Sequence, residues 1–241
     1  MTDGRSLPRL HVITEAAVLE RPGFLDAARD ILAATAATAA SGAAGPKMAL
    51  HLRGKIDGRL LHDLAIELLP VAHAAGVLLL INDRIDIARA VSTDGVQLGQ
   101  GSLSVADARL ILESDSRWVG VSAHGGEEAR IAAGADFLIV GNIWETPSHP
   151  ERAAAGTERL AQVAQALAGA GTGAYADSAV ETVPIIAIGG VTPDRVASAL
   201  SAGAHGVAVL GGIWSAPSPS EAAFRYLQML PPEPLTRDLD Q

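Results

Sequence analysis

Short apolar runs alternate with longer amphipathic stretches along most of the chain. The stretches between the runs, such as 60–74 and 127–133, carry apolar residues at helical spacing. The runs themselves, rich in Val, Ile and Leu, cover residues 10–14, 48–52, 77–81, 95–98, 118–121, 135–140, 183–188 and 206–210. Continuous apolar strands that alternate with helices indicate a parallel sheet covered by helices.

Eight such units predict a (β/α)₈ TIM barrel, an α/β fold that commonly occupies roughly 200–250 residues. We therefore expect residues 1–241 to form a single barrel domain, with its core over about 10–230 and a polar C-terminal tail over 231–241. An open doubly wound sheet is the alternative, but no Gly-x-Gly-x-x-Gly follows the first strand.

The composition excludes several classes of function. Hydrophobic residues make up 49% of the chain, so disorder is excluded, and the absence of cysteine excludes disulfides and thiolate metal sites. A net charge of −9 with 3% aromatic residues argues against a nucleic-acid partner. The longest apolar run, 76–81, is too short to span a membrane, and residues 1–10 do not resemble a secretion signal. We expect a cytoplasmic protein with no membrane partner.

Basic residues follow the second predicted strand. In such a barrel the active site lies at the C-terminal ends of the strands. Alternation places His51 and Arg53 on the same inward face, and Lys55 follows two residues later. Cations at a strand end suit an anionic substrate, since Arg holds phosphate in a two-pronged contact. A solvated basic loop is the alternative.

Asn82 and Asp83 end the third predicted strand. Asp83 could bind Mg²⁺ together with substrate phosphates, because Mg²⁺ is often held by one or two carboxylates and phosphate oxygens. Alternatively, Asn82 or Asp83 caps the helix that begins near Arg84. Both roles remain open.

The fifth and sixth strands end in polar residues that could contact a substrate. Ser122 and His124 follow strand five, and Asn142, Thr146, Ser148 and His149 belong to a long polar loop after strand six. A helix entry and a surface histidine are the plainer interpretations of His124 and His149.

Paired glycines end the last two strands. Gly189-Gly190 and Gly211-Gly212 lie where TIM barrels commonly bind phosphate through backbone N–H groups. We therefore predict phosphate binding by Gly189, Gly190, Leu210 and Gly211. Thr192 is the expected N-cap of the helix that follows strand seven.

Several of these stretches together resemble the thiamine phosphate synthase/TenI superfamily, and the resemblance extends from Leu10 to about Leu230. The stretches that carry it are LHVIT at 10–14, HLRGK at 51–55, INDR at 81–84, GVSAH at 120–124 and IAIGGVTP at 186–193. The family fold is the same (β/α)₈ barrel that the strand pattern predicts.

The resemblance implies one of two reactions. A synthase joins hydroxymethylpyrimidine diphosphate to a thiazole phosphate and releases pyrophosphate, with Mg²⁺. Arg53, Lys55 and Asn82 would then contact the pyrophosphate, and Asp83 would bind the metal. A TenI-type tautomerase moves a proton on the thiazole phosphate without a metal. In both, the glycine pairs would bind the thiazole phosphate.

The chain departs from both patterns. Synthases usually carry a second metal-binding Asp where this chain has Ser102, and a Lys where it has His149. The tautomerase's catalytic His precedes a Glu-Thr pair by three residues, and here that position is Asn142, whose amide cannot shuttle a proton.

The sequence at Gln97-Leu98, Gly101-Ser102, His51 and Glu145-Thr146 resembles the tautomerase branch. We therefore expect a TenI-like tautomerase without a metal, in which His149, His124 or His51 supplies the missing acid–base group. The alternatives are an Mg²⁺-dependent synthase and a non-catalytic barrel that binds a thiazole or thiamine phosphate. A helix over 221–230 could contact a second copy of the chain, but a barrel helix with a buried stripe is the simpler interpretation.

Overall fold

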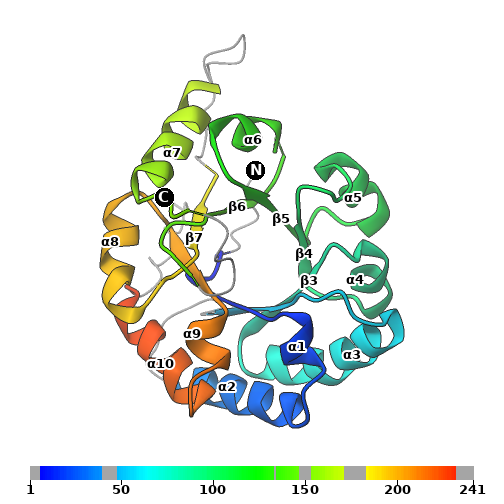
Figure 1. The fold of residues 1–241 in the computed structure, drawn as a ribbon. Helices are drawn as coiled ribbons and strands as arrows, with labels where there is room; N and C mark the ends of the chain where they lie inside the picture. The colour runs from blue at the N-terminus through cyan, green and yellow to red at the C-terminus, as the bar shows by residue number, and fades with distance from the viewer. Residues whose placement is uncertain (1–5, 40–47, 133, 147–152, 171–182, 232–241) are drawn as a thin grey trace, which may run out of the picture.

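The computed structural model describes residues 6–39, 48–132, 134–146, 153–170 and 183–231. Eight parallel strands close into a barrel in the order β1 to β8, and helices surround it (Figure 1). The strands are β1 Leu10–Ile13, β2 Met48–Leu52, β3 Val77–Asn82, β4 Gly95–Leu98, β5 Trp118–Ala123, β6 Phe137–Val140, β7 Ile185–Ile188 and β8 Gly206–Val209. The predicted TIM barrel is confirmed.

The helices cover the outside of the barrel and close as a ring where α10 packs against α2. They are α1 Ala16–Leu19, α2 Phe24–Ala39, α3 Gly58–Ala74, α4 Ile85–Val91, α5 Val105–Leu112, α6 Gly126–Ile131, α7 Glu158–Ala170, α8 Val196–Ser201, α9 Gly211–Trp214 and α10 Pro219–Met229, with a 3₁₀ turn at Pro193–Arg195. Asp57, Ser104 and Ser218 cap α3, α5 and α10 through their side chains.

One of two capping predictions is wrong. Neither Asn82 nor Asp83 caps α4: the N-cap residue is Arg84, and no side chain caps this helix. Asp83 has a φ of 61°, which turns its carboxylate toward the loop after β4 instead. Thr192 is the N-cap residue of the 3₁₀ turn, as predicted, although its hydroxyl makes no capping hydrogen bond. The strand ends also shift by one or two residues from the apolar runs, which leaves the order unchanged.

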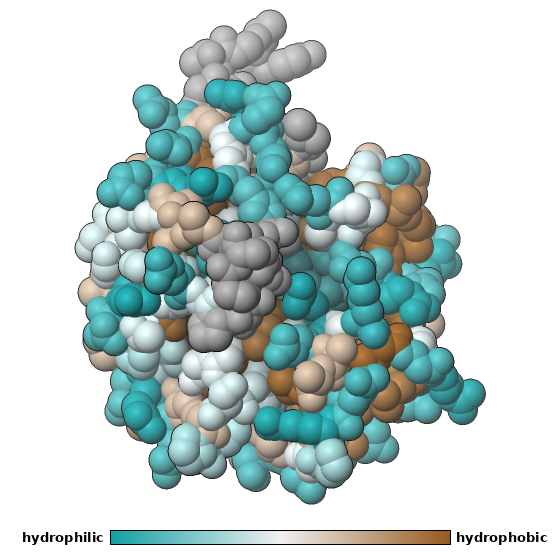
Figure 2. Space-filling view, viewed as in Figure 1, coloured by the Kyte–Doolittle hydropathy of each residue, from teal (hydrophilic) through white to brown (hydrophobic). Residues whose placement is uncertain are grey.

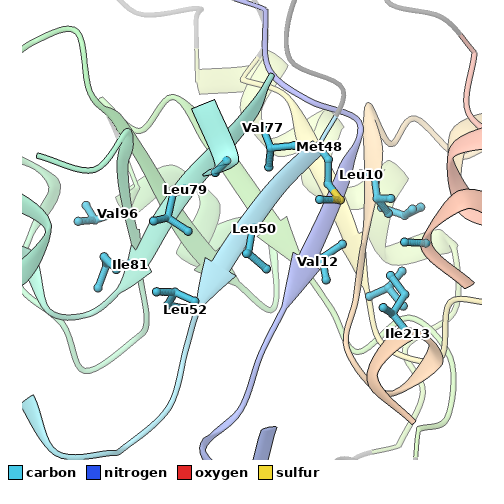
Figure 3. Close-up of a cluster of buried hydrophobic side chains, with 14 of the residues drawn as sticks. Leu10, Val12, Met48, Leu50, Leu52, Val77, Leu79, Ile81, Val96 and Ile213 are labelled. Carbon is cyan, nitrogen blue, oxygen red and sulfur yellow. The ribbon is translucent and has the colours of Figure 1, made fainter. Parts of the chain in front are cut away.

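The strands are buried on both faces, which explains why they read as continuous apolar runs. Their outward-facing side chains pack against the helices in one large cluster, part of which Figure 3 shows with Val12, Leu50 and Leu79 at its centre. A smaller cluster fills the barrel itself. It contains Leu7, Ile13, Ala49, Leu80, Phe137, Ile139, Ile186 and Ala208.

The polar residue Tyr226 connects α10 to the loop after β7. Its ring is buried, and its hydroxyl donates a hydrogen bond of 2.9 Å to the carbonyl of Val191. Burial raises the pKa of Tyr226 to about 12. The hydrogen bond therefore holds the last helix against the strand-seven end of the barrel.

Removing that hydroxyl should weaken the fold measurably. We expect Tyr226→Phe to lower the free energy of unfolding by about 1 kcal/mol, because the buried carbonyl of Val191 loses its donor while the ring packing stays. Urea unfolding followed by circular dichroism would measure this. Equal midpoints for the variant and the wild type would show that the bond contributes nothing.

Two apolar residues of α10, Phe224 and Met229, are 40% and 46% exposed, whereas Tyr226 faces the barrel. The helix thus has the ordinary buried stripe of a barrel helix. Across the described parts of the chain, no helix is both long and apolar enough to cross a membrane.

Candidate active site at the C-terminal ends of the strands

The inner wall of the barrel is divided at its C-terminal end into a polar half and an apolar half. Inward-facing positions on β2 to β5 place polar side chains there, whereas the rest of the wall is apolar. The polar residues are His51, Asn82, Gln97 and Ser122, and the apolar residues are Ile13, Ile139, Ile188 and Leu210. Figure 2, which views the same face as Figure 1, shows hydrophilic residues around a shaded recess to the right of the middle.

A buried pair of histidines lies beneath this end. Nδ1 of His11, on β1, is 2.8 Å from Nε2 of His51, on β2, and Nε2 of His11 is 3.0 Å from the carbonyl of Pro8. Burial lowers the pKa of His51 to about 4, although the neighbouring Asn82 side chain opposes the shift. Burial, and to a smaller extent the electrostatic effect of His51, holds the pKa of His11 well below its usual range. Both rings are therefore neutral at pH 7.

Several buried polar atoms at this end have no hydrogen-bond partner within the described residues. They include Nδ1 of His51, Oδ1 of Asn82, Oε1 of Gln97 and Nδ2 of Asn142. The other side of the Gln97 amide donates to Ser122 Oγ at 3.1 Å. Because buried polar groups are almost always paired, these atoms are available to a ligand or to water.

Asp83 projects a carboxylate from the end of β3. Its Oδ1 accepts hydrogen bonds from the backbone N–H of Gly99, at 2.9 Å, and from the hydroxyl of Ser102. The side chain is exposed, and its Oδ2 has no donor in the described part of the chain. Ser102, which replaces the second aspartate of the synthase pattern, therefore orients Asp83.

The donor set at Asp83 fits Mg²⁺ only when a substrate supplies further oxygens. Within the described residues no three His, Cys, Asp or Glu side chains come together as a metal cluster. One free carboxylate oxygen and one hydroxyl are too few for a protein cage, but Mg²⁺ commonly binds through one or two carboxylates and substrate phosphates. Asp83 can thus hold a magnesium ion that also contacts a diphosphate.

Two cations follow β2. The backbone of Arg53 is fixed by Thr14, whose hydroxyl accepts from the Arg53 N–H at 2.8 Å and lies 3.0 Å from its carbonyl. Neither Arg53 nor Lys55 has a carboxylate partner among the residues that the structure describes, whereas Arg84 is paired with Asp86. Arg53 and Lys55 are therefore available to an anion.

The glycine pair after β7 permits a close approach of the loop after β6. A Cβ on Gly189 would lie 1.6 Å from Oδ1 of Asn142, and Gly189 and Gly190 have φ values of 98° and 61°. The carbonyl of Gly189 accepts from the N–H of Trp144 at 3.0 Å. Sequence reasoning assigned these glycines to phosphate alone and missed this packing role.

Phosphate binding by the two glycine pairs stays a prediction. In the described residues the N–H groups of Gly189 and Gly190 have no protein acceptor. After β8, Leu210 precedes α9, and a Cβ on Gly211 would meet nothing within 4 Å. Free N–H groups and open space are what an anion needs at this place in a barrel.

Two of the remaining predicted site residues, His124 and Asn142, hydrogen-bond to neighbouring parts of the fold. His124 bonds to the carboxylate of Glu128 through its backbone N–H and through Nδ1, at 3.2 Å, and its carbonyl accepts from Arg159. It thus fixes the start of α6. The backbone of Asn142 bonds to Ala155, and Thr146 ends the described part of that loop. Ser148 and His149 lie outside the described residues.

Sequence reasoning missed His11 and did not assign a role to Gln97. Both are buried polar residues, at 0% and 1% exposure, on strands that are otherwise apolar. A buried polar side chain within such a strand was the available signal, because it needs a partner inside the barrel.

Comparison with known proteins places this site in a family. The profile of the family described as thiamine monophosphate synthase (TMP-TENI) matches residues 24–213. The thiamine-phosphate synthase of Salinibacter ruber is 34% identical over 225 residues, covering 92% of this chain and 88% of the relative. That of Roseiflexus castenholzii is 37% identical over 187 residues, covering 76% and 75%.

A solved structure agrees with the sequence matches. The thiamine phosphate pyrophosphorylase of Pyrococcus furiosus superposes with a TM-score of 0.69 at 25% identity, covering 92% of this chain and 94% of that one. With the family profile matching most of the chain, the resemblance seen in the sequence is confirmed. This protein belongs to the thiamine monophosphate synthase (TMP-TENI) family.

Proposed function

We propose that this protein is a transferase of the thiamine-phosphate synthase type. It would join the methylene carbon of a pyrimidine diphosphate to the ring nitrogen of a thiazole phosphate. Relatives that are 34% and 37% identical over most of this chain carry that name, which supports the synthase over the tautomerase expected from local motifs. Nothing in the comparisons supports the isomerase interpretation.

Asn142 is the observation that carries this choice. A tautomerase must remove a proton and return it, and the amide of Asn142 cannot do so. The transfer needs no such group. The C–O bond to the diphosphate breaks, pyrophosphate leaves with the electron pair, and the thiazole nitrogen forms the new C–N bond and becomes positively charged. Atoms and charge balance without a general base.

The cations and the carboxylate at the polar half would bind the diphosphate. Arg53 and Lys55 can contact its oxygens, since neither is engaged by a carboxylate within the described residues. Asp83, held by Ser102 and Gly99, would hold Mg²⁺ against the same oxygens. When bound, the ion would neutralise the charge that builds up on the leaving pyrophosphate.

The thiazole phosphate would bind on the opposite, apolar half. Backbone N–H groups of Gly189 and Gly190, together with the open space at Gly211 beside Leu210, suit its phosphate. The apolar wall of Ile13, Ile139 and Ile188 suits a neutral ring. The two substrates would then meet across the mouth of the barrel, which is the arrangement that a direct transfer requires.

A paired activity assay tests the proposal. We would incubate the purified protein with the pyrimidine diphosphate, the thiazole phosphate and Mg²⁺, and measure thiamine phosphate and pyrophosphate. Both products should form in equal amounts and disappear when the ion is chelated. Conversion of the thiazole tautomer alone, or binding of thiazole phosphate without turnover, would overturn the proposal in favour of the tautomerase or the binding protein.

A further inference from the structure

The buried histidine pair has no acid–base role in the transfer proposed above, because that reaction moves no proton. His11 and His51 are both 0% exposed, on adjacent strands inside the barrel. Their ring centroids lie 5.1 Å apart, and the ring of Phe137 covers the other side of His11 at 5.2 Å. Burying an imidazole costs free energy unless its nitrogens are hydrogen-bonded, and in the described structure Nδ1 of His51 is the nitrogen of this pair without a partner.

The hydrogen bonds around the pair determine where each proton lies. The carbonyl of Pro8 can only accept, so Nε2 of His11 carries a proton and donates it. Nδ1 of the neutral His11 ring is then an acceptor, and Nε2 of His51 must donate to it. A neutral His51 with its proton on Nε2 has a lone pair on Nδ1.

That lone pair lies among other acceptors. Nδ1 of His51 has no donor in the described structure, and neither do the side-chain oxygens of its neighbours Asn82 and Gln97. Asn82 and Gln97 are direct partners in the register of β3 and β4, and the side chain of Asn82 lies within hydrogen-bonding reach of His51, which opposes the lowering of its pKa. Three buried acceptors on three consecutive strands are therefore available to an N–H or O–H donor of a ligand or of water.

We propose that His11 is a positioning residue, which fixes the tautomer of His51 so that His51 Nδ1 accepts a hydrogen bond from an N–H donor of the bound substrate. The inference rests on the proposed function in that the substrate is one of the two that the transfer joins. Without His11, the proton of His51 could move to Nδ1. His51 would then offer a donor where the substrate also has one, and the two would repel.

The test compares two variants at position 11. His11→Leu removes the acceptor, whereas His11→Asn keeps an oxygen near the place of Nδ1. The tautomer of His51 is read from two-bond ¹H–¹⁵N correlations of the imidazole, with His51→Gln used to assign its signals. Ile186→Val, which trims another side chain inside the barrel, controls for altered packing.

We expect wild type and His11→Asn to show His51 protonated on Nε2. His11→Leu should show protonation on Nδ1 and a kcat/KM for the pyrimidine diphosphate that falls about 10- to 100-fold, as is common when a group that orients a ligand-contacting His is removed. His11→Asn should recover most of this loss. Ile186→Val should keep both the wild-type tautomer and the wild-type kcat/KM.

Two results would overturn the inference. One is a His51 tautomer that is the same in His11→Leu as in the wild type. The other is an equal loss of kcat/KM in the Leu and Asn variants, which would make the role of His11 purely structural. If the wild type formed no thiamine phosphate, the proposed function would fail, but the tautomer spectra would still decide whether His11 controls His51.

Discussion

Replacing Asp83 by asparagine should lower kcat for thiamine phosphate formation about 100- to 1000-fold, the range seen when one group that stabilises developing charge is removed. Oδ2 of Asp83 is free of protein donors in the described structure, and Ser102 and Gly99 hold the other oxygen. The neutral amide would therefore leave Mg²⁺ and the departing pyrophosphate without the carboxylate that Asp83 supplies at this strand end.

The fold should survive this change. Asp83 has a φ of 61°, and asparagine is among the residues that best tolerate this left-handed conformation. Asp86→Asn is the matched control, because Asp86 is exposed, lies three residues away and binds Arg84 rather than the site. Steady-state rates at saturating Mg²⁺ would measure both variants. If kcat of Asp83→Asn stayed within a factor of about three of the wild-type value, the loss would be far smaller than expected for a group that stabilises developing charge. That result would rule out the role proposed for Asp83.

The barrel could be predicted from the sequence because its strands are buried on both faces. Each appears as a short and mostly apolar run, and the number of runs indicates the architecture once helices lie between them. The strand ends then indicate the site. Arg53, Asn82, Asp83 and Ser122 lie at or just beyond the C-terminal ends of β2, β3 and β5, as the pattern predicts.

Contacts that depend on closure of the barrel could not be predicted. His11 and His51 are 40 residues apart, and only the register of β1 on β2 brings them together. The close approach of Asn142 to Gly189, which leaves no room for a Cβ, depends likewise on the loops that follow β6 and β7 lying side by side. The choice between the two reactions also depends on more than local sequence: motifs near Ser102 and Glu145 favour the tautomerase, whereas relatives matched over most of the chain carry the name of the synthase.

Acidification should destabilise the fold by about 3 kcal/mol between pH 7 and pH 4 through His51 alone. Burial lowers the pKa of His51 from 6.5 to about 4 in the folded protein, and the unfolded chain regains the ordinary value. Between these two values the unfolded state binds a proton that the folded state does not. This share of the stability is therefore complete above pH 6.5 and is lost as the pH falls toward 4.

The effect can be separated from that of the carboxylates by comparing variants. Among the residues that the structure describes, the groups that face the pair are neutral or also histidine, namely Asn82, Phe137 and His205, and no carboxylate among them offsets the loss. Urea unfolding at several pH values should show a shallower decline for His51→Gln, whose amide can still donate to His11 but cannot titrate. His62→Gln, at a partly exposed site on α3, should follow the wild type. Parallel declines of the free energy of unfolding for His51→Gln and the wild type would contradict the prediction. They would mean that protonation of His51 does not contribute to acid destabilisation of the fold.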